Sequence, residues 1–173
     1  MIIIWIYYIS NMKVIFLDID GVLNHEQFYR DKDSNIIKIL DLSLHLDPNS
    51  VRLLNEICEV TGAKVVLSST WRRHQSLDKA REIFKNKGFK GEIIDLTPDL
   101  TLNNPDFLRG NEILKWIKIN EKMLGANYKN YKDYVILDDK TFMLYWQKDN
   151  FFKIDPRVGL TPENVEEIIN FLS

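Results

Sequence analysis

The sequence predicts one α/β domain with a mainly parallel central sheet, and two patterns support this fold class. Three apolar runs, residues 13–18, 64–68 and 134–138, each end in a polar residue, as is typical of strands covered on both faces of a sheet. Helix-like stripes of apolar residues lie between the runs, and strands that alternate with helices favour a parallel order. A chain of 173 residues, 45% of them hydrophobic, has room for one core, so an active site must be built on that core.

An apolar extension, residues 1–12, precedes the domain, which we place at residues 13–173. The first nine residues are nearly all apolar, but a membrane span needs about 20 residues. A basic first region and a small-residue cleavage site, which mark a signal peptide, are both missing. Two interpretations remain: the extension is an edge strand or tail that covers an apolar face, or Met12 is the start, because the first strand begins at Lys13.

Four helices are expected, and each has a start or a stop signal in the sequence. They cover residues 48–62, 77–88, 109–125 and 162–172. After Asn24 a polar loop leads to leucines that alternate with polar residues between 40 and 46, which predicts a short strand or flap, too small for a cap domain. The large aromatic residues expected in the core are Trp116, Trp146, Phe151 and Phe152.

Charge and cysteine content exclude several classes of function. With 23 Lys and Arg against 25 Asp and Glu, the net charge is −2, so the overall charge gives no argument for a nucleic-acid or membrane partner. The single cysteine, Cys58, cannot form an internal disulfide or a thiolate zinc site. A reducing, cytoplasmic compartment fits this composition best.

Two carboxylates follow the first predicted strand. Asp18 and Asp20 are two positions apart, and Gly21 comes next. Residues i and i+2 of an extended segment project to one side, so both acids can face one ligand. Two like charges at the end of a buried strand are costly unless a cation or hydrogen bonds compensate them. A divalent cation is the simplest compensation.

The other two runs also end in polar groups. Asp138 and Asp139 close the 134–138 run, and together with the first acids they form an oxygen-rich ligand set of the kind that Mg²⁺ prefers. The run 64–68 leads into Ser68, Ser69, Thr70, Trp71, Arg72 and Arg73. Hydroxyl, amide and guanidinium groups bind phosphate. Because ligands bind at the carboxyl ends of parallel strands, we expect all these residues at one edge of the sheet.

With these residues in place, the chain from Lys13 to about Leu172 resembles the haloacid dehalogenase (HAD) superfamily of phosphohydrolases and phosphotransferases. The first motif is matched by residues 18–23, the second by Ser68, and the fourth by Asp138 and Asp139. The third motif is a basic residue at a helix start, for which Arg109 is our choice and Lys115 the alternative. The resemblance implies a Rossmann-like three-layer domain with a short flap and no large cap.

The resemblance also implies roles for these residues. Asp18 would be the nucleophile that forms an aspartyl phosphate, and Asp20 the general acid and base. Ser68 and Arg109 would hold the phosphoryl oxygens. Mg²⁺ would be held by Asp18, the Asp20 carbonyl and Asp138, while Asp139 would orient this set or join it.

Among the subgroups, the chain is most similar to cap-less phosphatases such as the phosphatase domains of polynucleotide kinase-phosphatase and of RNA repair proteins. The substrate would then be a bulky phosphorylated molecule such as a nucleic-acid end, with Ser69, Trp71 and Arg72 as contacts. Trp71 has two interpretations, stacking on a base or lining the mouth of the site. The alternatives are a phosphatase or phosphotransferase for nucleotides or small metabolites, and a non-catalytic module that recognises a phosphorylated partner.

Overall fold

The fold follows from a five-stranded, all-parallel sheet, which confirms the predicted fold class. The computed structural model describes residues 12–30, 45–100, 108–124 and 133–173; the extension 1–11 and the flap region 31–44 lie outside them. In the order in which they neighbour one another, the strands are β3 (Ile93–Leu96), β2 (Lys64–Leu67), β1 (Val14–Leu17), β4 (Tyr134–Asp138) and β5 (Phe151–Lys153).

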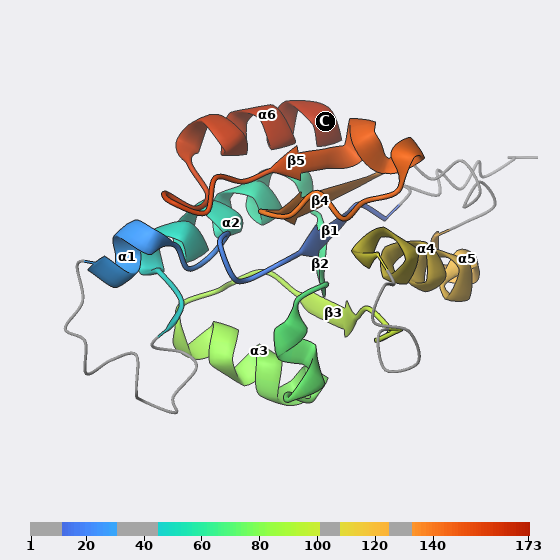
Figure 1. Ribbon diagram of the computed structural model, residues 1–173, viewed down its shortest axis with the longest axis horizontal. Helices are drawn as coiled ribbons and strands as arrows, with labels where there is room; N and C mark the ends of the chain where they lie inside the picture. The colour runs from blue at the N-terminus through green and yellow to red at the C-terminus, as the bar shows by residue number, and fades with distance from the viewer. Residues whose placement is uncertain (1–11, 31–44, 101–107, 125–132) are drawn as a thin grey trace, which may run out of the picture.

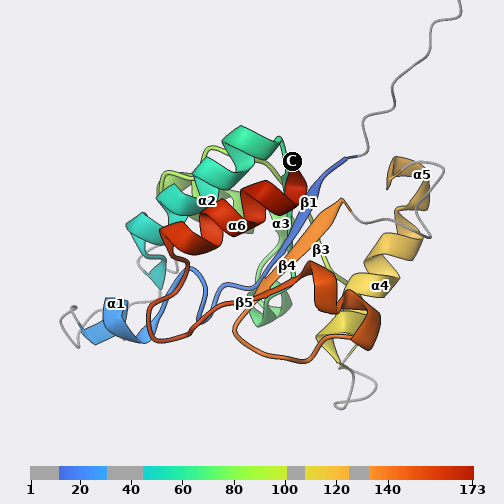
Figure 2. The same cartoon turned by 90° about the horizontal axis from the view of Figure 1, so that it is seen from above.

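Helices cover both faces of this sheet and give the three layers that the sequence predicted (Figures 1 and 2). One face packs against α2 (Pro48–Thr61), α3 (Leu77–Asn86) and α6 (Pro162–Leu172). The other face packs against α4 (Arg109–Ile119) and α5 (Glu121–Leu124). A short helix, α1 (Glu26–Arg30), follows β1, and the described residues also include the 3₁₀ helices η3 (Thr70–Arg73) and η5 (Tyr145–Asn150).

The central strand shows how the sheet divides the core. In β1, Ile15 and Leu17 point to the α2 side, whereas Val14 and Phe16 point to the α4 side, because successive side chains of a strand alternate between faces. On the α4 side, Trp116 packs edge-on against Phe16 at 5.3 Å between ring centroids. Strands buried on both faces are therefore apolar throughout, which is why the sequence shows β1, β2 and β4 as continuous runs.

The predicted helices form, with one difference. Asp47 accepts hydrogen bonds from the backbone N–H groups of Asn49 and Ser50 at the start of α2, and Thr161 accepts one from Asn164 at the start of α6, as capping residues do. The expected helix 109–125 ends at Ile119 and a short turn of helix, α5, follows Asn120. No helix in the described residues is long and apolar enough to cross a membrane.

The core prediction is right for one tryptophan and wrong for another. Trp116 is 1% exposed, but Trp146, in η5, is 62% exposed. Phe151 and Phe152 are half-buried in the edge strand β5. The segment that contains Trp146 buries its amide side chains instead, Gln147 and Asn150.

Candidate active site

The register of the three central strands brings the sequence motifs into one row. Leu17, the last residue of β1, lies beside Leu67 of β2 and Leu137 of β4. The next residue of each strand is therefore Asp18, Ser68 or Asp138, and these residues lie together at the carboxyl edge of the sheet. The pairing of the strands therefore brings Asp18, Ser68 and Asp138 together, although they are far apart in the chain.

An acidic cluster forms at this edge. Asp18, Asp138 and Asp139 each offer a carboxylate oxygen, and these oxygens lie within 4.8 Å of one another. Asp18 is 5% exposed and Asp138 is completely buried. Burial, reinforced by the negative charge of Asp18, raises the pKa of Asp138 to about 7. Burial also raises the pKa of Asp18, although Arg109 and a hydrogen bond with Ser69 act in the opposite direction.

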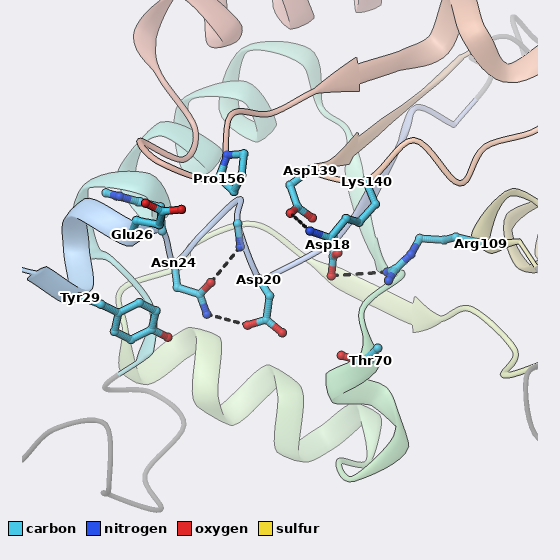
Figure 3. A pocket seen from close by; sticks show the side chains of 12 residues that line it. Asp18, Asp20, Asn24, Glu26, Tyr29, Thr70, Arg109, Asp139, Lys140 and Pro156 are labelled. Carbon is cyan, nitrogen blue, oxygen red and sulfur yellow. Dashed lines mark hydrogen bonds and ion pairs between the residues drawn. The ribbon is translucent and has the colours of Figure 1, made fainter. Parts of the chain in front are cut away.

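Two cations face this cluster in the described residues: Lys140, whose Nζ lies 2.7 Å from Asp139 Oδ2, and Arg109. Arg109 contacts the two buried carboxylates. Its Nη1 lies 3.4 Å from Asp18 Oδ1, and its Nε lies 3.1 Å from Asp138 Oδ2. Figure 3 shows the side chain reaching Asp18 from α4. Lys115, the alternative for this role, is exposed on α4 and does not line the pocket. The geometry therefore supports Arg109 as the basic residue of the site.

The start of α4, which carries Arg109, is fixed by the segment that follows β4. The Gly110 N–H donates to the Phe142 carbonyl at 3.0 Å, and Gln147 Nε2 donates to the Gly110 carbonyl at 3.0 Å. A Cβ at Gly110 would collide with Gln147 Oε1 and with the Leu144 backbone nitrogen. Only glycine allows this close approach, which holds the first turn of α4, and with it Arg109, against the site.

Asp20 lies on the opposite side of the pocket, in a different environment. It is exposed, and its carboxylate accepts a hydrogen bond from Asn24 Nδ2 at 2.8 Å. Trp71 Nε1 lies 3.2 Å from both of its oxygens. Asn24 Oδ1 in turn accepts from the Gly21 N–H at 3.0 Å. The Asp20 carboxylate is therefore held in one orientation while it remains open to a substrate.

The loop after β2 places hydroxyl groups next to Asp18 and the pocket. Ser68 is 1% exposed and its Oγ has no hydrogen-bond partner in the described residues. Ser69 is buried and contributes the hydrogen bond to Asp18, while Thr70 lines the pocket (Figure 3). Buried polar atoms normally have partners, so the unpaired Ser68 hydroxyl marks a place where a ligand oxygen fits.

The unpaired polar atoms as a group point to the same place. In the described part of the chain, four buried side-chain atoms lack a hydrogen-bond partner, and three belong to this site: Ser68 Oγ, Arg109 Nη1 and Asp138 Oδ2. The contacts of Arg109 with the two aspartates are ion pairs whose geometry leaves these atoms free to bond. The hydroxyl and the guanidinium nitrogen can each donate a hydrogen bond to an oxygen of an anion. The carboxylate oxygen can bind a cation.

One of the predicted substrate contacts, Arg72, lies elsewhere than expected, and the structure favours one of the two interpretations of Trp71. The Arg72 side chain is 4% exposed and forms an ion pair with Glu112 of α4, at 2.6 Å between Nη2 and Oε2. It therefore cannot grip a nucleic-acid backbone from this position. The Trp71 ring is half-buried, packs against the core and directs its N–H to Asp20. The interpretation of Trp71 as a residue at the mouth fits this geometry better than stacking on a base.

The pocket lined by Asp18, Asp20, Thr70, Arg109 and Asp139 has a volume of about 440 Å³, within the range of roughly 300–1,000 Å³ typical of ligand sites. Sequence reasoning missed Asn24, Tyr29, Lys140 and Pro156, which also line it. Asn24 carried the only usable signal, because it stands four residues after Asp20. The others come from α1 and from the loops after β4 and β5, and nothing in their sequence context indicates a site.

A three-layer domain with an all-parallel sheet and an acidic cluster at its carboxyl edge is the architecture of a HAD-superfamily phosphatase domain. A family model described as "HAD domain in Swiss Army Knife RNA repair proteins" matches residues 14–165. The chain belongs to this family. No curated protein and no solved structure gives a significant match.

Proposed function

We propose that the protein is a magnesium-dependent phosphomonoester hydrolase that acts through an aspartyl phosphate on Asp18. The observation that supports this most directly is the contact of Arg109 with Asp18 and Asp138, where Arg109 and Asp18 line one open pocket and Asp138 is buried behind them. A phosphate dianion repels a carboxylate nucleophile, so a site for this reaction must concentrate positive charge beside the attacking oxygen. Arg109 is one such charge.

The donor set fits Mg²⁺ as the second charge. Asp18, Asp138 and Asp139 would hold the ion, together with the Asp20 carbonyl, since hard cations prefer oxygen ligands. Arg109 contacts both Asp18 and Asp138, and Asp138 Oδ2 has no hydrogen bond within the described part of the chain. A bound Mg²⁺ would supply electrostatic screening of the incoming phosphate.

The two aspartates of the first motif, Asp18 and Asp20, have different roles in the proposed reaction. An Asp18 oxygen would attack phosphorus while the bond to the leaving oxygen breaks, and Asp20, in its protonated form, would give its proton to that oxygen. Asp20 would then take a proton from water, whose oxygen attacks phosphorus and frees Asp18. Ser68 and Arg109 would bind the phosphoryl oxygens through the hydroxyl and guanidinium groups that lack hydrogen bonds in the structure.

The substrate we propose is a phosphorylated polynucleotide end. The family description, which refers to RNA repair proteins, supports this class, and so does a pocket that is open to solvent. A 3′-phosphorylated oligonucleotide should then have a higher kcat/KM than the matching mononucleotide, and added salt should reduce the difference because backbone contacts release counterions. Equal turnover of the mononucleotide at low salt would instead indicate a small-molecule phosphatase.

The chemistry is tested with an aryl phosphate. Hydrolysis should disappear in excess chelator and return with Mg²⁺, and Asp18→Asn should abolish both turnover and trapping of radioactive phosphate on the protein. Asp20→Asn should still trap some phosphate but release it slowly. Undiminished turnover in chelator, or normal turnover by Asp18→Asn, would contradict the mechanism and identify a different nucleophile.

A further inference from the structure

The segment that leaves the active site after β4 exposes its aromatic side chains. Phe142 is 55% exposed, Tyr145 80% and Trp146 62%. All three lie within five consecutive residues, and we call them the aromatic ledge. Isolated apolar residues on a surface are ordinary, but a group of large aromatic residues left in water is typical of a binding surface.

The same segment buries two amide side chains while it exposes these aromatic rings. Gln147 is 1% exposed and Asn150 7%. Gln147 Nε2 donates to the Gly110 carbonyl and its Oε1 accepts from the Leu144 N–H at 2.9 Å, while Asn150 Nδ2 donates to the Tyr134 carbonyl at 2.7 Å. These bonds fix the backbone against α4 and β4. The aromatic ledge is therefore presented on a rigid support, because the segment anchors itself through its amides.

The segment that carries the ledge runs from the phosphate pocket to the start of α4. It begins at Asp139 and Lys140, which line that pocket, and the Phe142 carbonyl accepts a hydrogen bond from Gly110, the residue after Arg109. Figure 2 shows the segment passing from the end of β4 to the first turn of α4. A molecule whose phosphate occupies the pocket can therefore extend onto the ledge.

The charge on the segment indicates what kind of molecule this is. Between residues 140 and 150 the charged residues are Lys140, Lys148 and Asp149, and Lys148 Nζ lies 4.9 Å from the centre of the Tyr145 ring. Lys140 forms an ion pair with Asp139 at 2.7 Å, whereas Lys148 supplies a cation beside the rings. Exposed aromatic rings with a lysine beside them suit single-stranded nucleic acid, whose bases stack on the rings while the cation attracts its phosphates.

We propose that the aromatic ledge binds the bases of a single nucleic-acid strand whose terminal phosphate lies in the Asp18 pocket. This surface takes the place of the predicted contact through Arg72, which is buried. The inference rests on the proposed function, because the strand is oriented by its phosphate. It also goes further, since it names the surface that distinguishes a polynucleotide from a mononucleotide.

The test compares two substrates and two surfaces. The variant is Tyr145→Ser combined with Trp146→Ser, and Trp146→Phe is the conservative change that keeps a ring for stacking. Val60→Ser is the matched control, because Val60 is 60% exposed on α2, on the opposite face of the sheet from α4. Thermal unfolding checks that each variant is folded, and sedimentation reports its oligomeric state.

For a single-stranded oligonucleotide with a terminal phosphate, the double variant should lose at least about fivefold in kcat/KM for each base that stacks. Hydrolysis of an aryl phosphate should stay at the wild-type level, and both Trp146→Phe and Val60→Ser should retain most of the oligonucleotide activity. Unchanged oligonucleotide turnover in the double variant would overturn the inference. So would a wild-type dimer that the double variant converts to a monomer, because a second copy would then cover the ledge.

A separate binding measurement keeps the two proposals distinguishable. If the wild type hydrolyses no aryl phosphate, the proposed function fails, and the ledge is then tested by fluorescence anisotropy of a labelled single strand. Weaker binding by the double variant than by Val60→Ser supports the ledge, and equal binding by the two contradicts it.

Discussion

Arg109 and Arg72 approach the same site from two different elements, yet they have opposite environments. Arg72, in the 3₁₀ helix after β2, is buried in an ion pair with one carboxylate, that of Glu112. Arg109, at the start of α4, lies in the wall of the pocket and faces two carboxylates, those of Asp18 and Asp138. The positive charge of Arg72 is balanced by one carboxylate, whereas the single positive charge of Arg109 faces two carboxylates.

The difference separates a structural contact from a functional one. The Arg72 Nη1 also donates to the Ser69 carbonyl at 2.6 Å, and Glu112 Oε1 accepts from the Leu100 N–H at 3.0 Å. The pair thus joins the loop after β2 to α4, and both side chains use several of their polar atoms within the protein, although Arg72 Nε has no hydrogen-bond partner in the described residues. Around Arg109 the charge balance stays negative, which is a reason for the pocket to bind a cation.

The largest effect should come from breaking the buried pair. Arg72→Ala leaves Glu112 buried without its partner, and we expect the free energy of unfolding to fall by about 3–5 kcal/mol. The double variant Arg72→Met with Glu112→Leu should recover most of this loss, because an apolar pair of similar volume can replace buried charges. Urea denaturation measures both. Full stability in Arg72→Ala would show that the pair is not the structural contact described here.

The pH dependence of stability should differ between the two regions, and the reason is the burial of the Asp138 carboxyl group, reinforced by the negative charge of Asp18. The pKa of Asp138 is about 7 in the folded protein and near its ordinary value of 3.8 in the unfolded chain. At pH values between 3.8 and about 7, the Asp138 carboxyl group is protonated in the folded state and ionised in the unfolded chain. Without metal, the free energy of unfolding should therefore fall as the pH rises from about 4 to about 7, by on the order of a few kcal/mol, and level off above that.

Asp138→Asn is the control for this dependence. Urea denaturation in chelator between pH 5 and pH 8 should show a smaller decline for the variant than for the wild type, and Mg²⁺ should stabilise the wild type most at the upper end, where the carboxylates are ionised. A wild-type protein that gains stability relative to Asp138→Asn as the pH rises would contradict the raised pKa.

Arg109→Ala should act on catalysis more than on stability. Loss of a donor that binds the phosphoryl oxygens in the transition state should lower kcat/KM by about one hundredfold or more. Lys115→Ala, on an exposed position of the same helix, should be close to wild type. Steady-state kinetics on an aryl phosphate decide between the two residues, and the reverse result would assign the phosphate clamp to Lys115.

Much of this arrangement could be predicted from sequence because it depends on local patterns. The strands β1, β2 and β4 are continuous apolar runs, and a parallel sheet places their polar ends at one edge. Asp18, Asp138 and the hydroxyls after β2 therefore lie together regardless of the conformation of the loops between the strands. The strands β3 and β5 were missed because β3 is half-buried along most of its length and β5 has only three residues.

What could not be predicted depends on partners that are distant in the chain. Nothing near Arg72 reveals that Glu112 of α4 will bury it, so its sequence context is the same as that of an exposed phosphate contact. The aromatic residue Trp146 stands beside Gln147, and the burial of Gln147 under Gly110 is decided by the packing of η5 on α4. Local hydrophobicity therefore predicts that Trp146 is buried, whereas the buried side chain is that of Gln147.

The smallest effect concerns Trp71, the neighbour of Arg72, whose side chain reaches the opposite wall of the pocket. Its N–H donates to the Asp20 carboxylate, so Trp71→Phe keeps the packing ring and removes one hydrogen bond to a charged group. We expect kcat to fall by about tenfold, because Asp20 becomes less well oriented for proton transfer. A series of aryl phosphates with leaving groups of decreasing basicity tests this role, since a good leaving group needs no proton. The loss should shrink along the series, whereas an equal loss for every leaving group would mean that Trp71 acts only through the structure of the loop.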